Sequence, residues 1–414
     1  MNILMVNPNV VVGGAQKIML YLAKGLQARG HQVVIYTTVV DHSKLPAFTR
    51  ELTYVVEDVP ILRPGGELAN FTAIENVAVL AARLLRLRQG IARAIRRYRI
   101  DIVNPHNPPA NWLCSFLPMP VVWSCHNNPM GFYKPLRAGY SSLWPTKGRI
   151  HHRWLEAVYE GADYLVIRYG VNAIVSLSPK IAREIRQVYG RDSEAIPFAL
   201  SDEDGIQAQR TATPQKFERM EHDGLTMVQV GQLAQDKNPR LSLDVLEALR
   251  GRIPKVRLSF VGDGPLRPVL EQEVRRRGLE DCVSFLGFQD ERELDQVYAS
   301  AHILLFPGNH QPYGIVPIEA IHKSVVPIVA ETSGVTELLV RHGLTTVAKP
   351  TATAFAEQVC AVYARGGEVG QWLARLRESL EEELNYEHFL NRYEACFETC
   401  LRHRTSSRVR SRQV

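Results

Sequence analysis

The chain has 414 residues, which is too long for one ordinary core and about right for two domains. Hydrophobic residues make up 45% and charged residues 22%, close to the averages for globular proteins, so the composition excludes a disordered or fibrous chain. The net charge of +6 comes from 49 Lys and Arg against 43 Asp and Glu, and no nucleic-acid-binding signature accompanies it.

The cysteines and the first residues bear on the compartment. The six cysteines show neither CxxC pairs nor the paired spacing of a metal site, which favours reduced thiols in a cytosolic protein. The opening MNILMVNP lacks the regions of a signal peptide, and no stretch reaches the roughly 18 apolar residues of a membrane span. We therefore expect a cytoplasmic protein.

The N-terminal residues predict one βαβ unit. Residues 3–6 form a short apolar run typical of a buried strand, and Gly13-Gly14 indicates a loop after it. Apolar side chains then recur at helical spacing over residues 18–26, and residues 33–37 form a second β-branched run. Because parallel strands need a crossover between them, this order predicts a doubly wound α/β sheet.

The same alternation continues to about residue 200. Ser178-Pro179 is a typical helix start, because serine caps the first turn and proline fits its first position. The other predicted elements are helices at residues 72–99 and 151–160, and strands at residues 100–103, 121–124 and 173–177. We therefore expect an N-terminal Rossmann-like domain over residues 1–200.

A polar segment and a second series of elements follow. Residues 201–224 contain almost no β-branched runs and predict an exposed linker. Residues 225–385 predict a second Rossmann-like domain, with strands at 226–230, 257–261, 283–286, 303–306 and 326–329 and helices at 240–249, 268–277, 291–300, 316–322 and 354–363. The helix predicted at 386–401 is expected to pack back on the first domain, and the basic residues 402–414 to be disordered.

Much of the excess positive charge lies between Arg83 and Arg99, within one predicted helix. A basic helix of this kind can bind an anionic membrane surface. A solvated face that binds nothing has the same pattern. Both alternatives remain open from the sequence.

Gly13-Gly14 lies where the first strand turns into the first helix. Without Cβ atoms, this turn lets a ligand approach the helix N-terminus, although a tight turn without a ligand has the same signature. The GxGxxG fingerprint of dinucleotide binding is absent. We therefore expect no nicotinamide cofactor, and no other cofactor is indicated.

The second predicted domain carries a denser group of candidates. Lys237 follows the first strand through a loop that starts at Gly231, so it lies at the carboxyl edge of the sheet, where open α/β sheets bind ligands. A lysine there suits a phosphate, and a solvated loop lysine has the same pattern. A second strand ends in the glycine turn at Gly262.

The loop at residues 306–314 closes at Gly314 and leads into a predicted helix. The free amides and the dipole of a helix N-terminus attract an anion. Glu319 lies within this helix, where its two oxygens can accept hydrogen bonds from a ribose diol. A carboxylate on a helix is also a common surface residue.

The order of these motifs resembles the retaining glycosyltransferases of family four, which have the GT-B fold of two Rossmann-like domains with an interdomain cleft. The resemblance covers nearly the whole chain and is most specific from Val230 to Lys349. It is carried by Gly13-Gly14, Arg29-Gly30-His31-Gln32-Val33, Gly231 to Lys237, Val261-Gly262-Asp263-Gly264-Pro265, Pro312-Tyr313-Gly314 to Glu319, and Thr332-Ser333-Gly334-Val335-Thr336-Glu337.

The resemblance implies roles that the residues alone leave open. Lys237 would hold the donor diphosphate, Glu319 the ribose, and His126 would stand beside the transferring sugar. Taken alone, His126 fits a core or rim histidine better, and the resemblance reverses that preference. The implied catalytic residues are His126, Lys237 and Glu319. The implied donor-binding residues are Gly13, Gly14, Gln232, Lys237, Gly262, Gln311, Gly314, Ile315, Val316 and Glu319. The implied acceptor-side residues are His106 and Asn107, and no metal is implied.

Two residues depart from the family pattern. Gln232 stands where the family has an arginine, and Gln311 stands where it has the first glutamate of a Glu-x7-Glu pair. Losing the arginine removes a charge-assisted hydrogen bond worth about 1.5–3 kcal/mol. One change removes a positive charge and the other a negative charge, so the net charge of the site is that of the family. The pair favours retuned sugar recognition over an inactive site.

The expected function is transfer of a sugar from a UDP- or GDP-sugar to a hydroxyl acceptor, with retention of configuration and without a metal. The acceptor would be a glycan, a lipid-linked molecule or a small molecule in cell-envelope, polysaccharide or glycoconjugate biosynthesis. The protein would be cytoplasmic and could sit at the inner face of the membrane through Arg83–Arg99. Two alternatives remain: a degenerate GT-B protein that binds a nucleotide or a partner transferase without catalysis, and a GT-B sugar-nucleotide epimerase.

Overall fold

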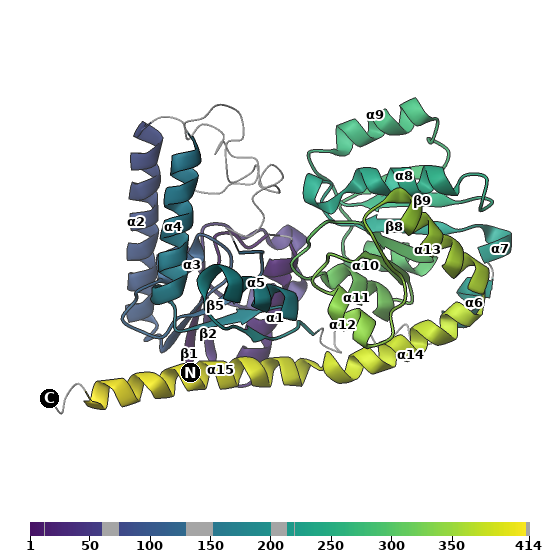
Figure 1. The fold of residues 1–414 in the computed structure, drawn as a ribbon. Helices are drawn as coiled ribbons and strands as arrows, with labels where there is room; N and C mark the ends of the chain where they lie inside the picture. Colours follow the sequence, from purple (N-terminus) through teal and green to yellow (C-terminus); the bar gives the residue numbers. More distant parts are fainter. Residues whose placement is uncertain (12, 60–73, 130–151, 200–212, 219, 411–414) are drawn as a thin grey trace. The chain divides into compact units, whose positions relative to one another are not determined.

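The computed structural model describes the chain except residues 12, 60–73, 130–151, 200–212, 219 and 411–414. The chain divides into two compact units, of which unit 1 comprises Met1–Phe198 and Tyr386–Val414 and unit 2 comprises Ala199–Asn385. Both units alternate strands and helices along the chain (Figure 1). The predicted doubly wound α/β class is confirmed by their parallel sheets.

Unit 1 contains a parallel sheet in the order β3-β2-β1-β4 and a parallel sheet in the order β5-β6-β7. A parallel bridge between Val103 and Val121 joins the two where β4 meets β5. The strands are β1 (Asn2–Val6), β2 (Gln32–Thr37), β3 (Thr53–Val56), β4 (Ile102–Pro105), β5 (Val122–Cys125), β6 (Ala173–Ser176) and β7 (Glu194–Ala195). The helices are α1 (Gly14–Ala28), α2 (Ile74–Arg97), α3 (Ala110–Cys114), α4 (His152–Gly170), α5 (Pro179–Tyr189) and α15 (Tyr386–Arg410), with short 3-10 turns η1 (His42–Lys44) and η2 (Ala47–Glu51).

Unit 2 contains one parallel sheet in the order β10-β9-β8-β11-β12-β13. Its strands are β8 (Thr226–Val230), β9 (Arg257–Val261), β10 (Val283–Gly287), β11 (Ile303–Phe306), β12 (Val326–Ala330) and β13 (Val347–Ala348). Its helices are α6 (Thr213–Glu218), α7 (Met220–Asp223), α8 (Pro239–Leu249), α9 (Arg267–Arg277), α10 (Glu291–Ser300), α11 (Ile315–His322), α12 (Thr336–Arg341), α13 (Ala352–Arg365) and α14 (Glu368–Glu383), with the 3-10 turn η6 (Gln235–Lys237).

The two units share one strand order. In each, the first strand lies in the middle, the second and third follow on one side, and the fourth and later strands follow on the other. Open α/β sheets bind ligands at the carboxyl ends of the strands on either side of this reversal. We call the carboxyl ends of β1, β4 and β5 the unit 1 switch point, and those of β8, β9 and β11 the unit 2 switch point.

The core of unit 1 forms where the sheet meets its helices. Leu4 and Val103 from the sheet belong to one buried cluster with Ile91 from α2 and with Ile181 and Ile185 from α5. The two α5 residues are four positions apart, so they lie on the same face of that helix. The predicted cap of α5 is confirmed, since Ser178 Oγ accepts from the amide of Ile181 over 3.3 Å.

The last helix, α15, packs on α1 within unit 1. Gly25 makes this approach possible, because a Cβ there would lie 2.6 Å from both terminal carbons of Leu390. Arg29 forms an ion pair with Glu394, and His31 Nε2 lies 2.6 Å from the same carboxylate. The Arg29-Gly30-His31 motif thus holds the C-terminal helix against the first one.

Two boundary predictions are corrected. Residues 213–218 and 220–223 of the predicted linker form α6 and α7, and Phe217 and Met220 are buried, because these helices pack into unit 2. Residues 402–410 of the predicted disordered tail continue α15 as helix. The remaining parts of both predictions, residues 201–212 and 411–414, lie outside the described residues.

Several elements have no counterpart in the predictions. They are β3, β7, β13, α3, α12 and α14. In addition, α4 extends to Gly170, and β4 lies two residues later than predicted. The short strands carry too few residues to establish a periodicity of their own.

Candidate functional site

Polar side chains follow three neighbouring strands at the unit 1 switch point. Asn7 comes directly after β1, while Asn107 and Asn127 follow the ends of β4 and β5. Asn107 Nδ2 donates to Asn7 Oδ1 over 3.4 Å, and Asn127 Nδ2 donates to Asn107 Oδ1 over 3.2 Å. Asn7 is fully buried, and its Nδ2 has no partner in the described part of the chain. The row of amides therefore ends at Asn7 Nδ2, a buried donor without an acceptor in the described part of the chain.

A pair of buried histidines lies beside this row. His106 Nδ1 and His126 Nε2 are 2.7 Å apart, and the rings stack with centroids 5.0 Å apart and planes inclined by 9°. Burial lowers the pKa of His126 to about 3. Burial, and secondarily the neighbouring His126, lowers the pKa of His106 well below its usual range. Both imidazoles are therefore neutral at physiological pH.

A buried carboxylate, which the sequence did not indicate, lines the same small pocket as the histidines. Asp163 accepts from Trp112 Nε1 over 2.6 Å and from Tyr189 Oη over 2.5 Å. Burial raises its pKa, while these two hydrogen bonds act in the opposite direction. Because both oxygens already accept a hydrogen bond, Asp163 fixes the wall of the pocket.

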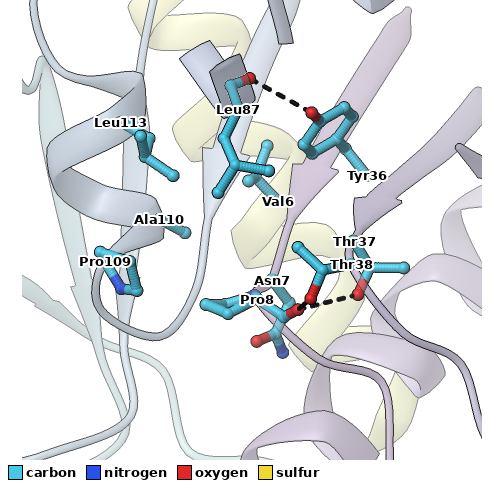
Figure 2. Close-up of a pocket in the computed structure, with 10 residues that line it drawn as sticks. All are labelled: Val6, Asn7, Pro8, Tyr36, Thr37, Thr38, Leu87, Pro109, Ala110 and Leu113. Atoms are coloured by element: carbon cyan, nitrogen blue, oxygen red, sulfur yellow. Dashed lines mark hydrogen bonds between the residues drawn. The ribbon is translucent and has the colours of Figure 1, made fainter. Parts of the chain in front are cut away.

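A second small pocket opens at the ends of β1 and β2 (Figure 2). Asn7 and Pro8 line one side of it, and Thr37 and Thr38 line another. Thr38 Oγ1 donates to the carbonyl of Pro8 over 2.7 Å, which ties the two strand ends together. Asn7 also belongs to the buried row of amides, so this pocket lies next to that row.

The glycine pair after β1 begins α1. Gly13 has an extended backbone with φ of 170°, and both Gly13 and Gly14 are exposed. A Cβ at Gly13 would lie 2.3 Å from Gln16 Oε1, the end of a side chain whose Nε2 donates to Asn9 Oδ1, and no side chain caps the helix. The α1 N-terminus therefore has room for a ligand, but its backbone does not require glycine at position 13.

Two glycine turns pack directly against each other at the unit 2 switch point. The amide of Gly231 donates to the carbonyl of Val261 over 2.9 Å. Gly262 has φ of 118°, and a Cβ on it would lie 2.2 Å from the carbonyl oxygen of Gly231. A Cβ on Gly264 would lie 2.5 Å from the carbonyl oxygen of Leu233. These contacts explain the glycines after β9, whereas after β8 it is the φ of 135° at Gly231 that favours glycine.

Lys237 and Gln311 come together at this edge, because their loops follow the neighbouring strands β8 and β11. Lys237 Nζ donates to Gln311 Oε1, and it also lies 3.4 Å from Asp236 Oδ2. Gln311 Nε2 donates to the carbonyl of Asp236 over 2.7 Å, and Gln229 Nε2 donates to the carbonyl of Lys237 over 2.9 Å. The buried side-chain amide of Gln311 therefore holds the ammonium group of Lys237 in place.

Gln232, the other departure from the family pattern, is exposed. It follows Gly231 in the same loop, and its side chain is not buried in the core of unit 2. A longer cationic side chain at this position would be free to turn toward a ligand. The two glutamines therefore differ in environment, since Gln311 is 4% exposed.

Gly314 begins α11 with φ of 138°, a conformation that favours glycine. A Cβ there would lie 2.9 Å from Val335 Cγ1. Ile315 and Val316 form the first turn of α11, and no side chain caps it. Glu319 lies in the next turn and is half-buried. The structure therefore places all of these residues on the helix that follows the Gln311 loop.

The predicted site residues fall into two sets. Unit 1 holds Gly13, Gly14, His106, Asn107 and His126, and unit 2 holds Gln232, Lys237, Gly262, Gln311, Gly314, Ile315, Val316 and Glu319. Sequence reasoning missed Asn7, whose position directly after the first strand was an available signal. It also missed Asp163, which no motif marked.

The described residues contain neither a cluster of metal ligands nor a helix that could span a membrane. No three His, Cys, Asp or Glu side chains among them lie together as metal ligands would. None of their helices combines the length and apolar character required to cross a bilayer.

Family models match both halves of the chain. Residues 12–198 match the model described as Glycosyltransferase Family 4, and residues 212–372 match the model described as Glycosyl transferases group 1. The chain is 24% identical over 361 residues to a glycogen synthase of Mycobacterium tuberculosis, a match that covers 82% of this chain and 80% of that protein.

Solved structures share the fold over nearly the full length. HepE of Anabaena, solved in complex with UDP, matches with a TM-score of 0.70 and 16% identity, covering 96% of this chain and all of that one. The catalytic domain of starch synthase IV from Arabidopsis thaliana, bound to ADP and acarbose, matches with a TM-score of 0.69 and 15% identity, covering 97% and 99%. At these identities the likeness establishes the fold.

Proposed function

Because the chain belongs to the family-four glycosyltransferases and has their GT-B fold, we propose that it transfers a sugar from a UDP- or GDP-sugar to a hydroxyl acceptor with retention of configuration. One observation carries this proposal. Lys237 stands at the unit 2 switch point, with its ammonium group oriented by the buried amide of Gln311.

Unit 2 would bind the nucleotide half of the donor. Lys237 supplies a positive charge for the diphosphate, and the amides at the start of α11, around Gly314 and Ile315, add hydrogen-bond donors and the helix dipole. Glu319, one turn later, would accept from the ribose hydroxyls. These groups would stabilise the charge that develops on the leaving diphosphate, so the proposed reaction is metal-independent.

Unit 1 would act on the sugar and the acceptor. His126 would hold a sugar or acceptor hydroxyl, and the amides of Asn7 and Asn107 lie beside it for further hydroxyl contacts. The acceptor oxygen would form the new bond to the anomeric carbon as the bond to the diphosphate oxygen breaks. With attack on the face of the leaving group, the hydroxyl proton would pass to the departing diphosphate.

A non-catalytic nucleotide-binding protein is the second candidate, and the exposed Gln232 favours it, since a family arginine is absent there. Donor binding alone would then remain. A sugar-nucleotide epimerase differs again, because it would release an altered sugar nucleotide without an acceptor.

One experiment distinguishes these functions. The full chain is screened by thermal shift against UDP-, GDP- and ADP-sugars, and the donors that bind are then assayed for hydrolysis and transfer, with the product anomer determined by NMR. We expect stabilisation by one nucleotide class, followed by slow hydrolysis or by transfer with retention. Binding without turnover supports the non-catalytic candidate, and a product with inverted configuration contradicts the proposed mechanism.

We also propose that unit 1 contacts an anionic membrane surface, although the structure reduces the number of arginines available for this. Arg88 Nη1 donates to the carbonyls of Leu113 and Ser115, each over 3.0 Å, so it connects α2 to the end of α3. Arg93 lies 3.0 Å from the carboxylate of Glu57. These two arginines act within the fold.

Other residues on unit 1 remain exposed. Arg96, Arg97 and Arg99 at the end of α2 are exposed. Phe116 is 60% and Tyr169 66% exposed, and the amide of Phe116 bonds to the end of α4, so these two aromatic residues lie near one another. Arginine and exposed aromatic side chains together suit a lipid interface.

Flotation tests the membrane proposal. The chain is mixed with neutral vesicles and with vesicles that contain an anionic lipid. We expect flotation only with the anionic vesicles, and loss of flotation when Arg96, Arg97 and Arg99 are all replaced by glutamate. Equal behaviour with both vesicle types contradicts the proposal.

A further inference from the structure

In the histidine pair at the unit 1 switch point, only two of the four ring nitrogens form a hydrogen bond within the described part of the chain. His106 is fully buried and His126 is 5% exposed. Only the inner nitrogens, Nδ1 of His106 and Nε2 of His126, form a hydrogen bond. The outer nitrogens, Nε2 of His106 and Nδ1 of His126, are buried without a partner in the described part of the chain.

The backbone of His106 is held on two sides. Its amide donates to the carbonyl of Val6 over 2.9 Å, and its carbonyl accepts from Trp123 Nε1 over 3.0 Å. Val6 ends β1 and Trp123 lies in β5, so both neighbours of β4 fix the position of His106. Among the described residues, the side chain of His126 has no hydrogen bond except the one that it shares with His106. The orientation of His126 therefore depends on His106.

Counting protons shows how the two rings are linked. Two neutral imidazoles carry two N–H protons, and the inner hydrogen bond uses one of them. The second proton must sit on one of the two outer nitrogens. If His106 Nδ1 donates, the outer proton is on His126 Nδ1, and if His126 Nε2 donates, it is on His106 Nε2. One outer nitrogen is always a donor and the other an acceptor.

We propose that His106 is a positioning residue, which fixes the ring plane and the tautomer of His126 so that the outer nitrogen of His126 faces a substrate hydroxyl with a defined hydrogen-bonding role. This inference rests on the function proposed above for His126. It reassigns His106 from the acceptor contact that its sequence position suggested. Asp163 and Tyr189 line the same pocket as the pair and bond to each other.

Two substitutions separate the parts of this role. His106→Phe keeps a flat ring for stacking and removes both nitrogens. His106→Asn removes the stacking ring, but it keeps a polar atom close to the position of Nδ1. Each full-length variant is first compared with the wild type by circular dichroism and by its thermal midpoint, so that a folding defect is recognised.

The measurement is a long-range ¹H–¹⁵N NMR spectrum of protein labelled at its histidines, recorded together with donor hydrolysis or transfer kinetics. We expect His126 to show a single tautomer in the wild type and a mixture of both in His106→Phe. We expect kcat to fall about tenfold in His106→Phe, as for loss of one hydrogen bond, with KM for the donor within twofold and with partial recovery in His106→Asn.

The outcomes are decisive in both directions. An unchanged His126 tautomer in a folded His106→Phe variant overturns the proposal, and so does an unchanged kcat when the tautomer does change. If the chain turns over no sugar nucleotide at all, the proposed function fails, whereas the NMR spectra still decide whether His106 sets the tautomer of His126.

Discussion

The two switch points occupy the same place in the same strand order, yet they are built from different chemistry. At the unit 1 switch point, neutral groups are buried against one another, with His106 and His126 stacked beside a row of amides. At the unit 2 switch point, two glycine turns bring backbone atoms close together, and Lys237 and Asp236 add charged groups at the edge.

Under the proposed function, this difference matches the two halves of a nucleotide sugar. A diphosphate requires positive charge and amide donors, which unit 2 offers. A sugar or acceptor presents hydroxyls, which neutral amides and imidazoles can both donate to and accept from. One strand topology thus supports two kinds of recognition, and the side chains after the strands decide which kind.

The largest expected effect tests whether the close packing of Gly262 against the backbone of Gly231 stabilises the unit 2 switch point. Gly262→Ala places a Cβ against the carbonyl of Gly231, and φ at this position is unfavourable for alanine, so unfolding should become easier by about 3 kcal/mol. Gly251→Ala is the control, because φ is also positive there but nothing lies within 4 Å; it should cost about 1 kcal/mol. Urea unfolding measures both values, and equal costs would contradict the packing argument.

The next effect addresses the role of unit 1 in turnover. His126→Ala should lower kcat about 100-fold, equivalent to about 2.7 kcal/mol, and should leave the affinity for the nucleoside diphosphate unchanged. His388→Ala removes an exposed histidine from α15 and should change neither quantity. A fall in nucleotide affinity without a fall in kcat would reverse the assignment of the two units.

A pH experiment tests whether the unit 1 switch point is neutral. The pKa of His126 is lowered to about 3 in the folded state, so below about pH 6.5 the unfolded chain binds a proton that the folded chain does not. Stability is therefore lost as the pH falls. Between pH 7.5 and pH 5.5 this histidine should contribute about 1.4 kcal/mol to the loss.

Matched variants isolate that contribution. His126→Asn should show a smaller loss of unfolding free energy between the two pH values than the wild type, by about 1.4 kcal/mol. His388→Asn is the control, because it removes an exposed histidine from α15. Identical pH dependence in all three proteins would mean that His126 titrates normally when folded.

A smaller effect concerns the two glutamines of unit 2. Gln311→Glu would form an ion pair with Lys237 and should weaken nucleoside diphosphate binding about tenfold. Adding Gln232→Arg should restore the affinity, since the new cation replaces the one that is neutralised. Titration calorimetry of the single and double variants measures this. Independent, additive effects would show that the two positions do not share one ligand.

Much of the fold could be predicted from the sequence, because buried parallel strands produce continuous apolar runs. The runs at residues 226–230, 257–261 and 303–306 coincide with β8, β9 and β11. The linker prediction failed because most residues of this segment are polar. Phe217 and Met220 are nevertheless buried, where α6 and α7 pack into unit 2. Each of these two short helices has one buried residue among the side chains that the structure describes, which is too few for a periodicity.

The site was predictable where residues follow strands directly. Lys237 and Gln311 meet because their loops leave neighbouring strands, β8 and β11, at one edge. The bond between His106 and His126 joins residues from different strands, and no local pattern specifies it. Asp163 was missed for the same reason, since its partners, Trp112 and Tyr189, lie far from it in the sequence.

Titration of the full chain with UDP, GDP and ADP by calorimetry tests most directly whether the unit 2 switch point binds the donor. The wild type is compared with Lys237→Ala and with Lys255→Ala, which removes an exposed lysine that precedes β9 at the opposite edge of the sheet. We predict that at least one nucleotide binds and that Lys237→Ala weakens it by about tenfold or more, while Lys255→Ala does not. An affinity within twofold of the wild type in Lys237→Ala would contradict the account.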